Sequence, residues 1–130
     1  MKQKLANVSI LVRDYDEAIA FYTQKLHFEL IEDTPLSPEK RWVLVAPPGG
    51  ADACRLLLAT ASKAAQVDQI GFQTGGRVFL FLHTDDFDRD YQNLVAQGIT
   101  IVRPPQVEEY GKVLVFADLY GNLWDLIQPA

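Results

Sequence analysis

Apolar and polar positions in the first 60 residues follow patterns that predict a strand, a helix and three further strands. Residues 5–13 are rich in Leu, Val and Ile and end at an acidic turn, as is typical of a β-strand. From Tyr15 to Leu26 the apolar residues recur at helical spacing, which indicates an amphipathic helix with Asp14 as its N-cap. The remaining strands are expected at 28–32, 41–46 and 55–59.

The same order of elements returns after residue 76. A strand is expected at 77–84, followed by a helix at 87–96 with Gly98 in its C-terminal cap position. We expect Tyr91, Leu94 and Val95 on the inward side of this helix. Three strands complete the second set, at 100–103, 112–117 and 123–128, with residues 118–122 as the turn between the last two.

The two halves correspond along their length, which indicates a duplicated unit. The correspondence places Val43 opposite Val113 and Leu57 opposite Asp125, and the offset between the copies shrinks as the loops shorten. This offset between the copies is longer than the repeat length of roughly 20–50 residues in solenoid proteins, so two modules fit better than an open array of repeats. We therefore expect one domain, 1–130, of class α+β, with tandem βαβββ modules at about 1–60 and 77–130 and a linker at about 61–76.

Composition narrows the classes of partner. With 48% hydrophobic and 22% charged residues, the chain has the make-up of an ordinary globular protein. Its net charge of −5 and lack of a basic patch argue against a nucleic-acid partner. No apolar run approaches the ~18 residues of a membrane span, so no membrane partner is expected. The single cysteine, Cys54, is compatible with a reducing, cytoplasmic location.

Three motifs give the chain a family resemblance. They are the Val-Arg-Asp strand end at 12–14 with Ala-x-x-Phe-Tyr at 18–22, Trp-Val-Leu-Val-x-Pro-Pro-Gly at 42–49, and Phe-x-Asp-x-x-Gly-Asn-x-Trp-Asp-Leu at 116–126. In these motifs the chain resembles the vicinal oxygen chelate superfamily, which comprises glyoxalase I, extradiol dioxygenases, fosfomycin-resistance enzymes and bleomycin-binding proteins. The resemblance covers essentially the whole chain. It implies a half-open barrel of curled mixed β-sheet with the helices outside, usually completed by a second subunit, so we expect a homodimer.

The resemblance also implies where a metal ion would bind. Members that carry a metal place its ligands on the first and fourth strands of each module, and those positions are Asn7, Leu57, Phe79 and Asp125 here. Leu57 and Phe79 offer no donor atom, whereas a catalytic metal ion needs three or four. We therefore expect no metal cofactor. Asp125 and His83 are the candidates for relocated metal ligands.

Strand alternation identifies candidate residues for a small-molecule pocket. Residues two apart share a face, so one face of each module combines apolar or aromatic side chains with a few polar ones. Alternation gives the candidate ligand-binding residues Asn7, Ser9, Leu57, Phe79, Phe81, His83 and Asp125. Two further candidates are Trp42, as a stacking platform, and Tyr110, on a loop that can close over the pocket. Of these, Asp125 and His83 are also the candidates for catalysis. A structural alternative stays open for both. His83 could be hydrogen-bonded to Asp85 or Asp86. Asp125 could be paired with Asn7 or Ser9 across the barrel.

Three functions remain open on this evidence. The first, which we favour, is metal-independent binding of a flat apolar or aromatic molecule, and the acidic chain suits a cationic drug. The second is a metal-dependent lyase or dioxygenase of the glyoxalase type with relocated ligands, so whether the chain is an enzyme stays open. The third is a regulatory module that senses a metabolite. Fold resemblance alone does not choose among them.

Overall fold

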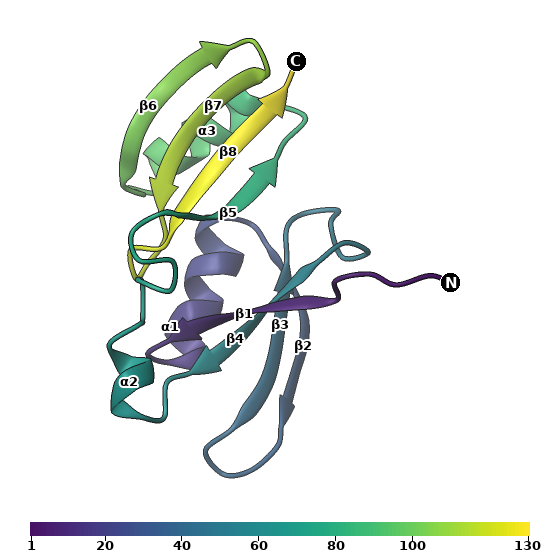
Figure 1. Ribbon diagram of the computed structural model, residues 1–130, viewed down its shortest axis with the longest axis vertical. Coiled ribbons are helices and arrows are strands. Elements are labelled where there is room, and N and C mark those ends of the chain that lie inside the picture. Colours follow the sequence, from purple (N-terminus) through teal and green to yellow (C-terminus); the bar gives the residue numbers. More distant parts are fainter. The chain divides into compact units, whose positions relative to one another are not determined.

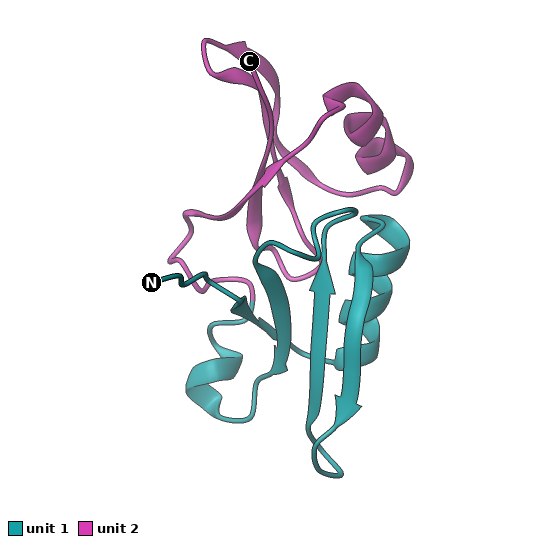
Figure 2. Ribbon diagram, turned by 90° about the vertical axis from the view of Figure 1, so that its right-hand side faces the viewer, with its two compact units in different colours: residues 1–70 teal, residues 71–130 magenta.

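The chain divides into two compact units, 1–70 and 71–130, in a computed structural model that describes residues 1–130 (Figure 2). The first unit begins with a strand and a helix and continues with three strands and a short helix (Figure 1). Its elements are β1 (Asn7–Val12), α1 (Tyr15–Ala20), η1 (Phe21–Lys25), β2 (Glu29–Pro35), β3 (Arg41–Ala46), β4 (Arg55–Thr60) and α2 (Ala64–Val67).

The sheet of the first unit has the order β1-β4-β3-β2. β1 pairs with β4 in parallel and the other pairs are antiparallel, so the sheet is mixed. Side chains alternate between its faces. Ile10 and Val12 are fully buried on the face against which α1 packs, whereas Asn7 and Ser9 on the other face are exposed. We call the face without a helix the open face.

The second unit repeats this plan. Its elements are β5 (Val78–His83), α3 (Phe87–Ala96), β6 (Ile101–Glu108), β7 (Gly111–Ala117) and β8 (Leu123–Pro129), and the sheet order is β5-β8-β7-β6. β5 and β8 are parallel and the other pairs are antiparallel. In Figure 1, α3 lies behind the sheet, so the open face points toward the viewer. The predicted α+β class with two tandem βαβββ modules is confirmed.

Strand register corrects the correspondence between the two halves. Val43 pairs with Leu58 in the first sheet, and Leu114 pairs with Leu126 in the second. Val43 and Leu114 are both buried on the helix side, whereas Val113 lies on the open face opposite Ile127. Val43 therefore corresponds to Leu114 and not to Val113, because partner strands fix the register and a one-residue slip would turn the buried side chains outward.

The first helix differs from a plain α-helix. Asp14 caps α1 as predicted, since its carboxylate accepts a hydrogen bond from the Glu17 N–H at 2.8 Å. The helix then widens into the π-helical turn η1, which buries Phe21 as well as Tyr22. The wider turn changes which side chains face the sheet, and the α-helical spacing therefore missed Phe21.

The second helix has the predicted bounds, and Gly98 beyond its C-terminus has the expected positive φ of 68°. The prediction that Val95 faces inward is wrong, because its side chain is 57% exposed. α3 rests on β8 through a narrow stripe that buries Phe87 and Leu94, and Val95 lies about 100° around the helix from Leu94. β6 extends to Glu108, beyond the predicted 100–103, as an edge strand whose register shifts accommodate prolines.

A charged cluster fastens the first helix to its sheet. Arg41 on β3 donates to both carboxylate oxygens of Asp33 at 2.6 and 3.0 Å, forms an ion pair with Asp16 at 2.9 Å, and lies 5.1 Å from the ring centroid of Tyr15. Hydrogen bonds from Arg41 lower the pKa of Asp33. Burial raises the pKa of the Tyr15 phenol, but hydrogen bonds with Thr60 and the Arg41 backbone outweigh it and the net pKa is lowered. The cluster lies on the helix side of the sheet, so none of its residues belongs to the open face.

No helix in the chain is long and apolar enough to cross a membrane.

Candidate functional site

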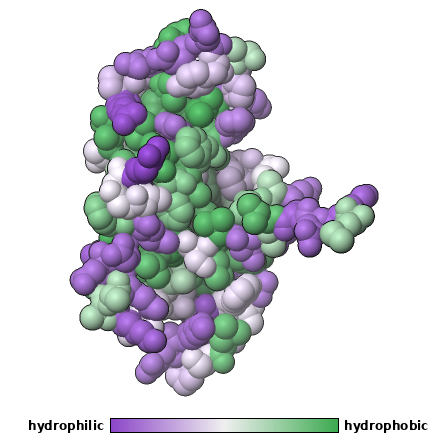
Figure 3. Space-filling view, viewed as in Figure 1, coloured by the Kyte–Doolittle hydropathy of each residue, from purple (hydrophilic) through white to green (hydrophobic).

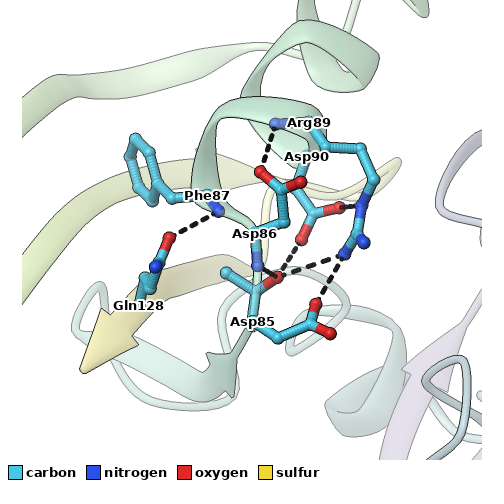
Figure 4. Close-up of polar contacts among 7 residues, drawn as sticks. Asp85, Asp86, Phe87, Arg89, Asp90 and Gln128 are labelled. Carbon is cyan, nitrogen blue, oxygen red and sulfur yellow. Dashed lines mark hydrogen bonds and ion pairs between the residues drawn. The ribbon is translucent and has the colours of Figure 1, made fainter. Parts of the chain in front are cut away.

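The turn after β5 caps the second helix, and a hydrogen bond joins the start of this helix to β8 (Figure 4). Asp86 caps α3 by accepting a hydrogen bond from the Arg89 N–H at 3.1 Å, and the Thr84 hydroxyl donates to Asp90. From β8, the side-chain oxygen of Gln128 accepts the Phe87 N–H at 2.8 Å. The polar turn is thus explained by helix capping.

The same turn determines the surroundings of His83, the last residue of β5. Asp85 forms an ion pair with Arg89 at 3.1 Å, and Asp86 is occupied as the helix cap. No hydrogen bond joins His83 to either aspartate, and its side chain is exposed on the open face opposite Ile127. The structure therefore does not support the alternative that His83 is hydrogen-bonded to one of these aspartates.

The open face of the second sheet carries a hollow of about 440 Å³. Figure 3 shows apolar and polar residues mixed over this side of the second unit. The hollow is lined by Gly76, Arg77, Val78, Phe81, Arg103, Leu123 and Asp125. Three of these side chains belong to one row across the four strands, because Arg103 pairs with Val115, Val115 with Asp125, and Asp125 with Phe81.

A β-bulge decides which residues of β5 reach this hollow. The register shifts between Val78 and Leu80, so Val78 faces Leu123 and Phe79 is the extra residue. The alternation that placed Phe79 on the open face therefore breaks at this point, and Val78 lines the hollow in its place. Phe81 keeps its predicted direction and is 64% exposed, which is unusual for a large aromatic side chain.

Asp125 is the acidic residue of the hollow. It is partly buried, and this burial raises the pKa of its carboxyl group, while the positive charge of Arg103 lowers it to a smaller extent. The carboxylate of Asp125 forms no hydrogen bond and no ion pair in the structure, although the residue pairs with Phe81 and Val115 in the sheet. A partly desolvated carboxylate that forms no hydrogen bond within the protein is available to accept one from a ligand.

The other predicted site residues lie elsewhere. Asn7, Ser9 and Leu57 lie on the open face of the first sheet, and Trp42 is on β3 opposite Thr34. Tyr110 is 58% exposed in the turn between β6 and β7 and does not line the hollow. Of the nine candidates, the structure therefore brings Phe81 and Asp125 together in one hollow.

The residues at the family's metal positions do not fit a metal ion. Leu57 carries no donor atom. In the first sheet Asn7 pairs with Arg55, and in the second sheet the corresponding pair is Val78 with Leu123, so Val78 rather than Phe79 is the counterpart of Asn7. Val78 and Phe79 also lack donors, which leaves an amide and a carboxylate for an ion that needs at least three ligands. No group of three or more His, Cys, Asp or Glu side chains in the chain is arranged to hold a metal.

Sequence reasoning missed Gly76, Arg77, Val78 and Arg103 as lining residues. The sequence signal for Arg103 is a charged residue directly after the β-branched stretch 99–102, where a strand is expected and one of its faces can be solvated. Val78 could not, because the bulge that reorients it depends on pairing with β8.

Comparison with known proteins gives a consistent family. The model of the Glyoxalase/Bleomycin resistance protein/Dioxygenase superfamily matches residues 4–126. An uncharacterized protein of Shewanella frigidimarina (strain NCIMB 400) is 60% identical over 98% of this chain and 95% of its own length. The uncharacterized protein YurT of Bacillus subtilis (strain 168) is 32% identical over 96% and 98% of the two chains.

Solved structures match over the same extent. The crystal structure of UcmS2 has a TM-score of 0.84 and 30% identity, with 98% of each chain covered. TnmS3, described as an antibiotic binding protein from Streptomyces sp. CB03234, has a TM-score of 0.78 and 28% identity over 100% of this chain and 98% of its own.

Proposed function

Because this chain belongs to the glyoxalase/bleomycin resistance protein/dioxygenase superfamily, we propose that it binds a small, largely apolar or aromatic molecule without the family's metal ion. The observation that carries the proposal is Phe81, which is 64% exposed in a hollow beside Asp125, whose carboxylate forms no hydrogen bond or ion pair. The antibiotic-binding description of TnmS3 adds support, since that protein shares the fold and 28% of its sequence.

The chemistry of the hollow suits such a ligand. Phe81, Val78 and Leu123 offer an aromatic ring and two aliphatic side chains against which a flat molecule can pack. Asp125 adds one directional acceptor, and a few polar groups in an apolar setting are what orient ligands in small-molecule sites. The volume of about 440 Å³ falls within the roughly 300–1,000 Å³ usual for such sites.

Phe81→Ala tests the proposal directly. We expect this substitution to weaken binding of an uncharged fluorescent aromatic probe, phenylnaphthylamine, by about tenfold, because a ring contact worth about 1–2 kcal/mol is lost. Fluorescence titration gives the affinities. The matched control is Phe72→Ala, which removes a ring that is 53% exposed and does not line the hollow. Equal losses in both variants would overturn the assignment of the site.

Metal analysis separates the proposal from the enzyme alternative. With two donors at the family positions, we expect elemental analysis to find no stoichiometric metal in purified protein, and nickel, manganese, zinc or iron to shift the melting temperature by less than about 1 °C. A stoichiometric metal whose thermal shift disappears in Asp125→Ala would favour the lyase or dioxygenase alternative with relocated ligands.

We further propose that the chain forms a homodimer. The support is the family resemblance, in which a second subunit usually completes the half-open sheet. Light scattering at micromolar concentration should therefore give twice the chain mass of 14.6 kDa. A mass of one chain across that range would refute the dimer.

A further inference from the structure

We propose that the ligand of the second sheet is an anion, namely a flat aromatic compound with a carboxylate, sulfonate or ionised phenol that Arg77 and Arg103 bind. This inference rests on the proposed function, because it names the chemical class of the molecule that the same hollow takes. It departs from the cationic ligand that the overall acidity of the chain suggested.

The first support is the local charge of the hollow. Its lining residues include two arginines, Arg77 and Arg103, against one acidic residue, Asp125. The hollow is therefore net positive within a chain whose net charge is −5. A local patch of opposite sign to the whole molecule attracts an anion at short range, where the remaining charges are screened within about 10 Å.

The second support is that no short-range contact holds the guanidinium groups of these two arginines, although the charge of Arg103 acts on Asp125 from beyond ion-pair distance. Arg13, Arg41 and Arg89 each pair with a carboxylate at 2.6–3.1 Å. The side chains of Arg77 and Arg103 form no ion pair or hydrogen bond in the structure, and both residues are exposed. Their fork of N–H groups is thus available for a carboxylate, sulfonate or phenolate oxygen.

The third support is the spacing along the row. Phe81, Asp125, Val115 and Arg103 occupy successive strands, so the backbones of Phe81 and Arg103 are about 14 Å apart at the usual strand spacing. An arginine side chain that lies over the sheet covers roughly half of that span. The remaining distance matches a molecule of about two fused rings that packs on Phe81 and directs its acidic group at Arg103.

The first unit provides an internal comparison. Its corresponding row is Ser9, Leu57, Leu44 and Glu32. Glu32 thus stands where the second sheet has Arg103, and Leu57 stands where it has Asp125. The edge strand β2 of the first sheet is acidic on its open face, with Glu29 and Glu32, and would repel the same anion. Charge therefore selects the second sheet for this ligand.

Asp125 provides a further test of the inference, because its negative charge repels an anion. When ionised, Asp125 accepts a hydrogen bond from a hydroxyl or N–H group of the ligand, but it also repels the acidic group that the arginines attract. Removal of this charge in Asp125→Asn should therefore strengthen binding of an anionic aromatic compound. The same substitution should weaken binding of a cationic one.

A matched pair of probes tests the inference on the full chain. Anilinonaphthalene sulfonate and phenylnaphthylamine share one ring system and differ in the sulfonate. We expect Arg77→Gln and Arg103→Gln each to weaken binding of the sulfonate about fivefold and to leave the neutral probe within about twofold, as for the loss of one partly solvated charge contact. Asp125→Asn should strengthen binding of the sulfonate by about twofold to fivefold. The control Lys112→Gln removes one positive charge from the helix side of β7, and it should change neither affinity.

The outcomes distinguish this inference from the proposed function. If Arg103→Gln weakens both probes equally, or Lys112→Gln weakens the sulfonate as much as Arg103→Gln does, the anion inference is overturned while aromatic binding stands. If neither probe binds, or Phe81→Ala leaves both affinities unchanged, the proposed function fails and the anion inference fails with it. A loss confined to the sulfonate in the two arginine variants supports both.

Discussion

Phe116→Ala should lower the free energy of unfolding by about 3–5 kcal/mol, as truncation of a buried aromatic residue usually does. Phe116 lies on the helix side of β7, is 1% exposed, and stacks on Trp124 with ring centroids 5.8 Å apart and an interplanar angle of 9°. Alanine would remove this stacking and leave a cavity on the helix side of the sheet. Because a domain is stable by only about 5–15 kcal/mol, the loss would leave a marginal fold.

Urea denaturation measures this loss, and the same sheet supplies the control. Phe81 lies on the opposite face and is 64% exposed, so Phe81→Ala should change the free energy of unfolding by less than about 0.5 kcal/mol. The two variants make the same chemical change on two faces of one sheet. Comparable losses from both would show that Phe81 is part of a packed core and is not available to a ligand.

The two faces of the second sheet have different roles. The helix side of the second sheet holds the unit together through Leu114, Phe116, Trp124 and Leu126, all nearly fully buried. The open face carries the charged and aromatic groups of the hollow. A substitution on the open face can therefore change binding affinity with little effect on the free energy of unfolding. For this reason the binding affinity of Phe81→Ala reports on function.

Much of this division is visible in the sequence. Along β8 the side chains alternate, with Trp124 and Leu126 on one side and Asp125 on the other, and this period of two depends only on neighbouring residues. For the same reason the bounds of β3 and α3 were predicted correctly. Asp14 marked the start of α1, and Gly98 marked the end of α3. Local patterns sufficed wherever local energetics decides the structure.

Features that depend on partner strands could not be predicted in this way. The bulge that turns Val78 rather than Phe79 toward the hollow arises where β5 adjusts to β8. The correspondence of Val43 with Leu114 depends on which residues each strand pairs with. Arg103 joins the hollow through Val115 on a neighbouring strand, which a single-strand pattern does not reveal.

The duplication carries different information about scaffold and chemistry. Both units keep the strand order and the buried helix side, so the core positions correspond between them. On the open faces the corresponding residues differ in kind, with Ser9 against Phe81 and Glu32 against Arg103. Packing requirements constrain the helix side of both copies, whereas the open faces are free to diverge toward a single site.

The second large effect concerns the turn that joins β7 to β8. Asp118 is 6% exposed, and its carboxylate accepts three hydrogen bonds at 2.9 Å, from the Tyr120 N–H, the Asn122 N–H and the Asn122 side-chain amide. We expect Asp118→Ala to lower the free energy of unfolding by about 2–4 kcal/mol, because it removes charge-assisted hydrogen bonds and leaves buried donors without an acceptor. Urea denaturation would measure the loss.

Asp118→Asn separates the acceptor from the charge in this turn. The amide oxygen of asparagine can still accept the two backbone N–H groups, but its NH₂ group faces the Asn122 amide as a second donor, so an intermediate loss of about 1–2 kcal/mol is expected. The turn precedes the strand that pairs Asp125 with Val115, so we expect both variants to weaken binding of the aromatic probes, Asp118→Ala more than Asp118→Asn. If Asp118→Ala unfolds at the same urea concentration as the unsubstituted chain, the carboxylate does not hold this turn.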